Sequence, residues 1–206
     1  MTASLEAPSH QTPAASPRRT PPGRIRRSGR AAGRSSLYCA ALIPLAIGAV
    51  IVALSGQARG AAPWWRWLRT RVLGAPSPQA TRRPGFFALV GHALLSVLLG
   101  TAALMLLGIE VVFVLRGVFY GLVDRGPYNN SWGGPTRAGA WLAHFLVGVP
   151  FTVAGLLALI GIAAIHQRLT LALDGGRRAP WLVPVTLVIS LAGALFFVAW
   201  LQQLPS

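Results

Sequence analysis

Lysine is absent from this 206-residue sequence, and acidic residues are almost as scarce. Only four residues are acidic: Glu6, Glu110, Asp124 and Asp174. A single cysteine, Cys39, excludes an internal disulfide and a cysteine-rich zinc site. Four carboxyl groups spread along the chain also offer little material for a metal cage or a catalytic carboxylate pair. We therefore predict no metal site and no cofactor.

Charge of either sign is limited, because only 11% of the residues are charged while 53% are hydrophobic. The mean hydropathy is +0.55. A soluble domain needs a polar surface, and about a quarter of its residues are ordinarily charged. Lipid as the surrounding solvent removes this contradiction. The composition therefore predicts an integral membrane protein.

The net charge of +15 comes from 19 arginines. In a soluble protein this excess would indicate nucleic-acid binding. Here the arginines flank apolar segments, which favours anionic lipid headgroups as partners and argues against nucleic acid. The abundance of Arg, Ala, Gly and Pro is also typical of a GC-rich coding bias, so any single arginine carries less weight.

Four apolar runs predict an all-α, polytopic transmembrane helical bundle with about four spans. The expected spans cover residues 37–54, 86–109 with an extension toward 122, 140–165 and 182–199. Residues 1–36 are rich in Pro, Ser, Thr, Ala and Arg without apolar periodicity, which predicts a disordered basic tail. A multi-pass protein of the bacterial cytoplasmic membrane, with one transmembrane domain over residues 37–206, is expected.

The first run, residues 37–54, is the weakest span. Its 18 residues reach roughly 27 Å as a helix, against a hydrocarbon core of about 30 Å. A cleaved signal peptide is the alternative, with Gly56, Gln57 and Ala58 as a loose cleavage site. The long basic lead-in and the apolar remainder favour an uncleaved span.

The segment after it combines tryptophan with arginine and predicts an interfacial helix over about residues 63–74. On a helical wheel, one side carries Trp64, Trp65, Trp67, Leu68 and Val72. The opposite side carries Arg66, Arg69 and Thr70. We expect residues 59–83 and the N-terminal tail to contact anionic headgroups.

Two topologies compete. Four spans with a cytoplasmic N-terminus place ten arginines inside and nine outside, which is almost no positive-inside bias. If the first run instead enters the membrane and returns, the distribution becomes 16 inside and three outside. A turning backbone in lipid leaves polar groups unpaired, so we favour four spans.

Glu110 is the leading candidate for a functional residue, because an ionisable group inside a span is costly. Its neighbours one helical turn away are apolar, and Arg116 faces elsewhere on the helix. The alternative, which we favour from the sequence, is that the membrane ends near Ile109. Glu110 would then lie among the headgroups while Arg116 extends toward them.

The loop over residues 121–138 is the most distinctive segment, with turn-forming Gly-Pro pairs and two aromatic residues. We expect an ordered cap that packs on the helix ends. Its candidate ligand or partner residues are Asp124, Arg125, Tyr128, Asn129 and Trp132. Arg116 and His144 are expected on the same side, with Glu110 deeper. A structural turn is the alternative.

The histidines of the second and third spans are expected to pack rather than to catalyse. His92 and His144 belong to stripes of small and weakly polar residues, which close helix packing in lipid uses. The two helices should be antiparallel, so these histidines lie near opposite faces and do not share a metal. His166 is expected in a short connector, with Arg168 and Asp174, between the third and fourth spans.

No motif for nucleotide binding, for a catalytic triad or for a metalloprotease occurs in the chain. The composition and layout resemble uncharacterised small polytopic membrane proteins of high-GC actinobacteria, a resemblance that assigns no residue roles. We expect a non-enzymatic accessory or interaction protein, with a membrane protein partner or a second copy. The alternatives are a small sensor or transporter that uses Glu110 and the 121–138 loop, and, least supported, an enzyme that uses His144 with Asp124 or Arg125.

Overall fold

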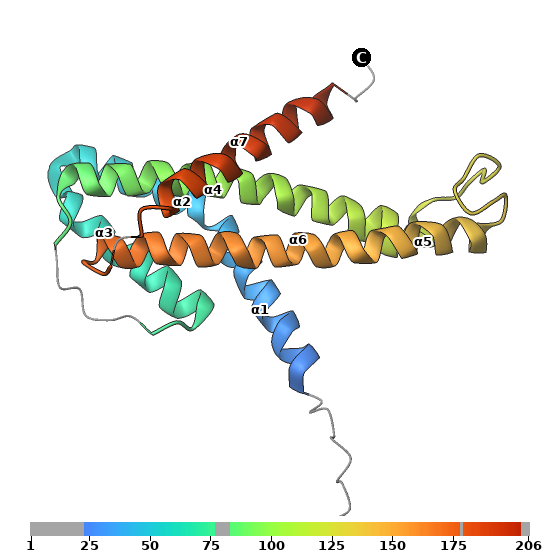
Figure 1. The fold of residues 1–206 in the computed structure, drawn as a ribbon, viewed down its shortest axis with the longest axis horizontal. Coiled ribbons are helices and arrows are strands. Elements are labelled where there is room, and N and C mark those ends of the chain that lie inside the picture. Colours follow the sequence, from blue (N-terminus) through green and yellow to red (C-terminus); the bar gives the residue numbers. More distant parts are fainter. Residues whose placement is uncertain (1–22, 77–82, 178, 203–206) are drawn as a thin grey trace, which may run out of the picture.

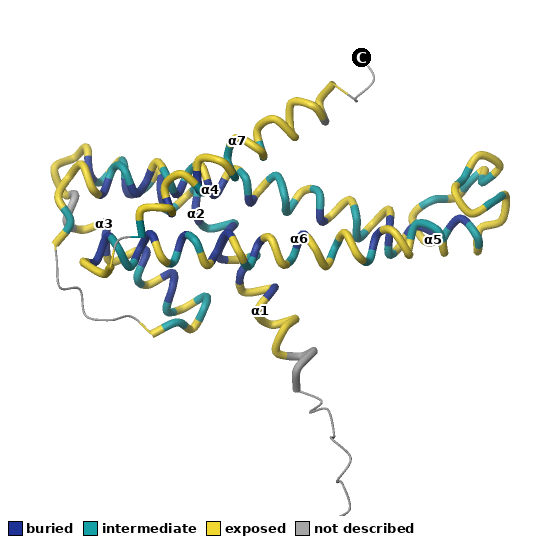
Figure 2. The backbone as a smooth tube through the Cα atoms, viewed as in Figure 1, coloured by how far each residue is buried: buried dark blue, intermediate teal, exposed yellow. Residues whose placement is uncertain are grey.

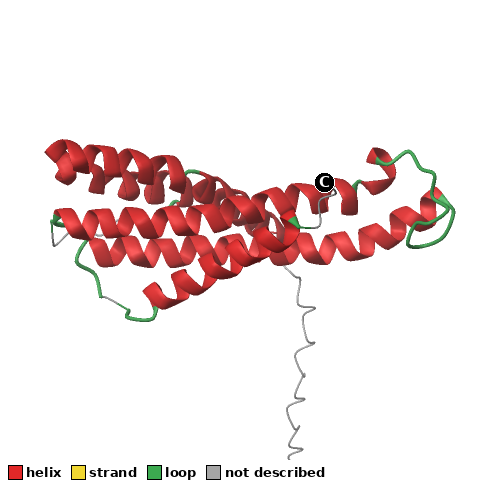
Figure 3. Ribbon diagram, turned by 90° about the horizontal axis from the view of Figure 1, so that it is seen from above, coloured by secondary structure: helices red, strands yellow, loops and turns green. Residues whose placement is uncertain are grey.

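The computed structural model describes residues 23–76, 83–177 and 179–202. Within these ranges the ordered elements are helices and no strand occurs, as Figure 3 shows. Four helices are long and apolar enough to cross a membrane: Arg27–Gln57, Phe86–Val118, Arg137–Leu173 and Leu182–Ala199. The predicted all-α bundle with four spans is confirmed, and the chain is a multi-pass membrane protein.

The described chain begins with a helix, although the sequence predicted a disordered tail up to residue 36. Residues 1–22 of that tail lie outside the described residues. The remaining part belongs to α1 (Gly23–Ala40), which continues through a turn at Ala41 into α2 (Leu42–Val52). Alanine and arginine are good helix formers, which explains why the helix starts before the apolar run.

Two helices form the centre of the bundle: α4 (Phe86–Phe113) and α6 (Arg137–Leu173). They run side by side along the long axis of the molecule (Figure 1). A Cβ atom placed on Gly117 would lie 2.6 Å from the Cα of Gly148, so glycine allows the two backbones to touch. Gly148 belongs to the small-residue stripe that the sequence predicted for packing.

Local signals set the ends of α6. Thr136 caps its N-terminus, where the Thr136 hydroxyl accepts a hydrogen bond from the Gly139 amide at 3.1 Å. At the C-terminus Gly175 adopts a left-handed φ of 98°, which stops the helix. The helix is longer than the predicted span of residues 140–165. His166 and Arg168 therefore lie within α6, and the prediction that they occupy a connector was wrong.

The chain turns back after the first span, so that this span and the segment after it form a helical hairpin. A π-helical turn, η1 (Ala53–Gln57), follows α2, and Gly56 at a φ of 80° reverses the chain into α3 (Ala58–Leu68) and a second π-helical turn, η2 (Arg69–Leu73). The arms are antiparallel, because a Cβ atom on Gly48 would meet Trp64 at 3.1 Å and one on Gly74 would meet Arg34 at 3.2 Å. Both arms are helical, so the turn leaves few backbone groups unpaired.

The second arm of the hairpin overlaps the predicted interfacial helix, but its faces differ from the prediction. Trp65 and Arg69 are both buried, with 0% and 1% of their surfaces exposed. Trp67, in contrast, is 56% exposed. The packed face of this arm, which runs from α3 into η2, therefore combines a tryptophan with an arginine that the sequence placed on opposite sides.

The first arm is part of the core. Tyr38, Leu42, Ala46 and Ala49 are all fully buried. Figure 2 shows that the buried segments gather where α2, α3, α4 and α6 meet. Cleavage near Gly56 would remove these contacts from the bundle.

The last helix, α7 (Leu182–Leu201), is the least enclosed. It lies against α4 as far as Gly193, where a Cβ atom would meet Ala102 at 3.4 Å. Its C-terminal part diverges from the bundle (Figure 1) and is exposed (Figure 2). The far end of the bundle is closed by η3 (Val114–Val118), the short helix α5 (Tyr120–Val123) and the loop that leads to α6.

Candidate functional site

Glu110 lies in the interface between α4 and α6 and is only 6% exposed. Its carboxyl group lies directly over Gly155 of α6, so close that a Cβ atom at that position would overlap Glu110 Oε1. Only glycine admits the carboxyl here. The glycine is therefore a second component of the site.

The depth of this carboxyl follows from its partner. Gly155 is the middle residue of the span Arg137–Leu173, and the α4 span continues beyond Glu110 to Val118. The apolar span thus continues past Ile109, the residue near which we placed the end of the membrane from the sequence. Glu110 faces the middle of the longest apolar helix.

Two buried polar atoms, one on each helix, have no hydrogen-bond partner among the described residues: Glu110 Oε2 on α4 and Thr152 Oγ1 on α6. Thr152 precedes Gly155 by three residues on α6, so both residues lie on the same face of the helix. Phe113 stacks on Phe151 beside them, with ring centroids 5.0 Å apart. The site thus combines a carboxyl and a hydroxyl in apolar surroundings.

The chemistry open to this pair is narrow. An ionised carboxylate without a counter-charge is very costly in an apolar interior. Glu110 forms no ion pair with any described residue. A proton on the carboxyl or a bound cation would neutralise it, and the Thr152 hydroxyl supplies an additional oxygen ligand or hydrogen-bond partner.

The loop after α5 is an ordered cap, as its composition predicted. Tyr128 donates a hydrogen bond from its hydroxyl to the Asp124 carbonyl at 2.7 Å. The Gly126 amide donates to the Asp124 carboxylate at 2.9 Å. Trp132 lies over His144, with ring centroids 6.1 Å apart. Asn129, in contrast, is exposed and contributes none of these contacts.

The imidazole of His144 is held between two aromatic rings. Tyr120, which the sequence did not single out, stacks on it at a centroid distance of 3.6 Å. His144 Nδ1 lies 2.8 Å from the Ala140 carbonyl, so Nδ1 carries the proton and donates it. The Asp124 carboxylate and the His144 ring therefore make their hydrogen bonds within their own segments.

The predicted site residues do not form a single cluster in the structure. Asp124, Tyr128, Trp132 and His144 meet in the cap. Glu110 stands apart, deeper in the bundle and against Gly155. Two arginines, Arg116 and Arg125, are exposed and line one groove with Asp124.

A second buried polar cluster joins three helices and was missed by the sequence analysis. His166 Nδ1 lies 2.7 Å from the Tyr38 hydroxyl, and His166 Nε2 lies 2.8 Å from Ser96 Oγ. Ser96 donates its hydroxyl proton to the His92 carbonyl at 2.7 Å. It therefore accepts from His166 Nε2, and His166 Nδ1 accepts from Tyr38. The chain of hydrogen bonds runs in one direction through neutral groups.

His92 closes this cluster toward α3. Its ring lies 5.1 Å from the ring of His166 and meets Trp65 edge to face at 4.7 Å. His92 packs at the end of the bundle opposite the cap, so it does not meet His144, as expected. The sequence does contain a signal for this buried cluster, because polar residues lie four apart at positions 92 and 96 and at positions 166 and 170.

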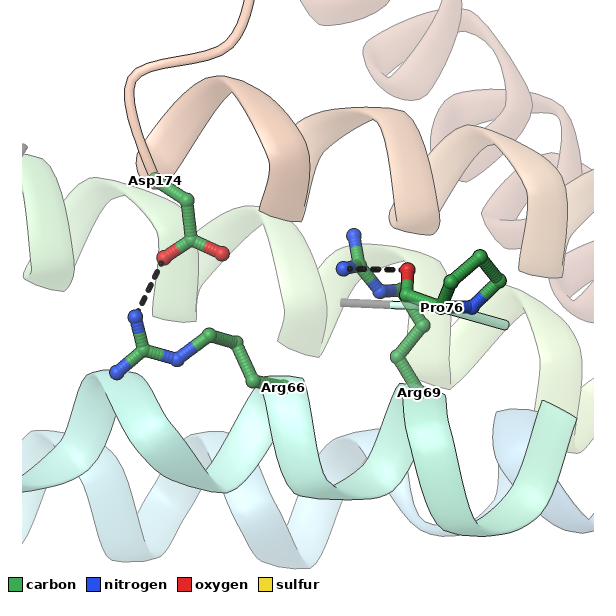
Figure 4. A network of polar contacts seen from close by, with 4 residues as sticks. All are labelled: Arg66, Arg69, Pro76 and Asp174. Atoms are coloured by element: carbon green, nitrogen blue, oxygen red, sulfur yellow. Dashed lines mark hydrogen bonds and ion pairs between the residues drawn. The ribbon is translucent and has the colours of Figure 1, made fainter. Parts of the chain in front are cut away.

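An ion pair attaches α3 to the end of α6. Arg66 lies 3.3 Å from the Asp174 carboxylate, and Arg69 donates to the Pro76 carbonyl at 3.2 Å (Figure 4). Burial raises the pKa of the Asp174 carboxyl, and the two arginines oppose that shift. Both arginines thus make contacts within the protein.

Among the described residues, no three His, Cys, Asp or Glu side chains gather closely enough to hold a metal ion. Comparison with protein-family models, with curated proteins and with solved structures gave no match. The resemblance to actinobacterial membrane proteins therefore stays a prediction.

Proposed function

We propose that this protein is a small, non-enzymatic sensor or transporter in which Glu110 exchanges a proton or a monovalent cation. The observation that carries this proposal is the pair of buried, unpartnered atoms, Glu110 Oε2 and Thr152 Oγ1, opposite the middle of α6. The proposed location is the bacterial cytoplasmic membrane, with the N-terminal tail and residues 59–83 near anionic headgroups.

The stability of the fold does not explain why a carboxyl group is buried at position 110. Buried polar groups in folded proteins are nearly always hydrogen-bonded, so an unsatisfied pair calls for an explanation. An apolar side chain at position 110 would pack against the neighbouring apolar residues without the cost of burying a charge. A reversible ligand, held by the carboxyl and the Thr152 hydroxyl, is such an explanation.

The role of an accessory protein is the second candidate, and one feature favours it. A groove of about 450 Å³ between α4 and α7 is lined by apolar side chains, including Leu104, Phe196 and Phe197, and by Gly108. A Cβ atom on Gly108 would meet nothing within 4 Å. Small residues on an open apolar surface suit close packing of a partner helix.

Proton flux in vesicles tests the leading proposal. The purified protein would be reconstituted in liposomes that enclose a pH-sensitive dye, and a sodium or potassium gradient would be imposed. We expect a change of internal pH with the wild type and none with Glu110→Gln, which keeps the shape of the side chain. Glu6→Gln, in the N-terminal tail, is the charge-matched control.

Carbodiimide labelling tests the same site without requiring transport. A lipid-soluble carbodiimide reacts with protonated carboxyl groups, and mass spectrometry locates the adduct. We expect an adduct on Glu110 that decreases as the pH or the cation concentration rises. If labelling does not depend on pH or cations, and if Glu110→Gln leaves the proton flux in vesicles unchanged, Glu110 is a structural residue.

A further inference from the structure

The groove at the end of α4 has a charged part and an apolar part. Its volume is about 460 Å³, and its apolar lining comes from Val112, Leu115 and Val123. Its polar lining comes from Arg116, Tyr120, Asp124 and Arg125. We propose that this groove binds one anionic phospholipid, with its phosphate at the two arginines and an acyl chain along the apolar part.

The place of the groove in the fold matches the length of a lipid. Val112 and Leu115 belong to the span Phe86–Val118, and Arg125 follows it by seven residues. Val112 and Leu115 therefore lie within the span, Arg116 lies two residues before its end, and Arg125 lies beyond it. A phospholipid has the same order, with acyl chains in the hydrocarbon region and a phosphate at the interface.

The two guanidinium groups are available for a ligand. Arg116 and Arg125 are exposed, and neither forms an ion pair or hydrogen bond with any described residue. The nearby Asp124 carboxylate accepts a hydrogen bond from the Gly126 amide at 2.9 Å and so has a structural task. Guanidinium groups bind phosphate oxygens through paired, charge-assisted hydrogen bonds.

The charge of the groove selects among lipids. Two arginines and one carboxylate leave a net charge of one positive unit, which complements a phosphodiester without a cationic headgroup. A zwitterionic choline lipid would bring its own cation toward Arg116 and Arg125. Phosphatidylglycerol is therefore expected to bind and phosphatidylcholine is not.

Ring contacts hold Tyr120 in one wall of the groove, and a side chain that is already held lowers the entropic cost of binding. Tyr120 stacks on His144 at a centroid distance of 3.6 Å, and its ring lies 6.5 Å from that of Tyr128. Tyr128 in turn is tied to the Asp124 carbonyl. The aromatic residues of the cap thus position the groove rather than form a separate site.

Native mass spectrometry with defined lipids tests the proposal. The full-length protein would be released from detergent micelles that contain equal amounts of phosphatidylglycerol and phosphatidylcholine. We expect the wild type to retain one phosphatidylglycerol preferentially. Arg116→Gln with Arg125→Gln should lower that affinity about 25-fold, at about fivefold for each arginine near the membrane surface.

The matched control is Arg27→Gln with Arg30→Gln, which removes two exposed arginines from α1. Unchanged thermal unfolding of both double variants shows that each one folds. Equal retention of the two lipids by the wild type would overturn the proposal, as would an equal loss in the control variant. Displacement of the lipid by excess inorganic phosphate would also overturn it, because the ligand would then be a free anion.

Discussion

Two buried polar sites lie along the same pair of helices, α4 and α6, and they differ in how their hydrogen bonds are satisfied. At one site Tyr38 donates to His166, His166 donates to Ser96, and Ser96 donates to the His92 carbonyl. At the other, Glu110 Oε2 and Thr152 Oγ1 have no partner among the described residues. Satisfied groups hold helices together in lipid, whereas unsatisfied groups need a reason other than stability.

The number of helices that meet explains the difference. The first site receives the Tyr38 hydroxyl from α1 in addition to the two central helices. At the second site the carboxyl of Glu110 on α4 lies over the bare backbone of Gly155 on α6. A third helix supplies the missing donor at one site, and a ligand would have to supply it at the other.

The largest expected effect comes from removing the His166 ring. His166→Ala leaves the Tyr38 and Ser96 hydroxyls without their partner and opens a cavity, so the free energy of unfolding should fall by about 2–4 kcal/mol. Chemical unfolding in detergent measures this change. Tyr38→Phe, which removes one hydrogen bond, should cost only about 0.6–1.7 kcal/mol. Two variants as stable as the wild type would show that the cluster does not hold the helices.

Gly155→Ala is expected to move the Glu110 carboxyl without removing it. The new methyl group overlaps Oε1, and the flexible side chain rotates away at a cost of about 0.5–1.5 kcal/mol. Proton flux and carbodiimide labelling should then fall as they do for Glu110→Gln. Gly161→Ala, on the same helix with open space around the new Cβ atom, is the control. Normal proton flux in Gly155→Ala would show that exchange at Glu110 does not require the carboxyl to lie over Gly155.

The depth of Glu110 is tested by a cysteine beside it. Val111 is 58% exposed on the outer face of α4. In a Cys39→Ala background, Val111→Cys should resist a membrane-impermeant maleimide in intact vesicles, whereas Asn130→Cys in the cap should react from one side. Rapid labelling at position 111 would return Glu110 to the headgroup region.

The smallest effect is expected in the cap. Trp132 is 71% exposed and touches the bundle through its stack on His144. Trp132→Ala should lower the free energy of unfolding by about 0.5–1.5 kcal/mol, and it should leave proton flux unchanged. A loss of flux in this variant would join the cap to the Glu110 site and contradict the separation between them.

Several features could be predicted from local sequence. Composition and the lengths of apolar runs predicted the four spans, and turn-forming residues predicted the cap. The helical wheel of residues 63–74 was misleading, because it treated lipid and water as the only surroundings. Asp174, at the end of α6, pairs with Arg66, and a wheel drawn for one helix contains no information about such a partner.

The sequence by itself determined that the chain spans a membrane and where its apolar helices lie, because hydrophobic length is a property of each segment alone. Only the tertiary structure decided which polar groups meet. Tyr38 and His166 are 128 residues apart, and Glu110 meets a glycine on another helix. Such pairings depend on how each helix is rotated and on its depth against its neighbours, which the packing of the whole bundle determines.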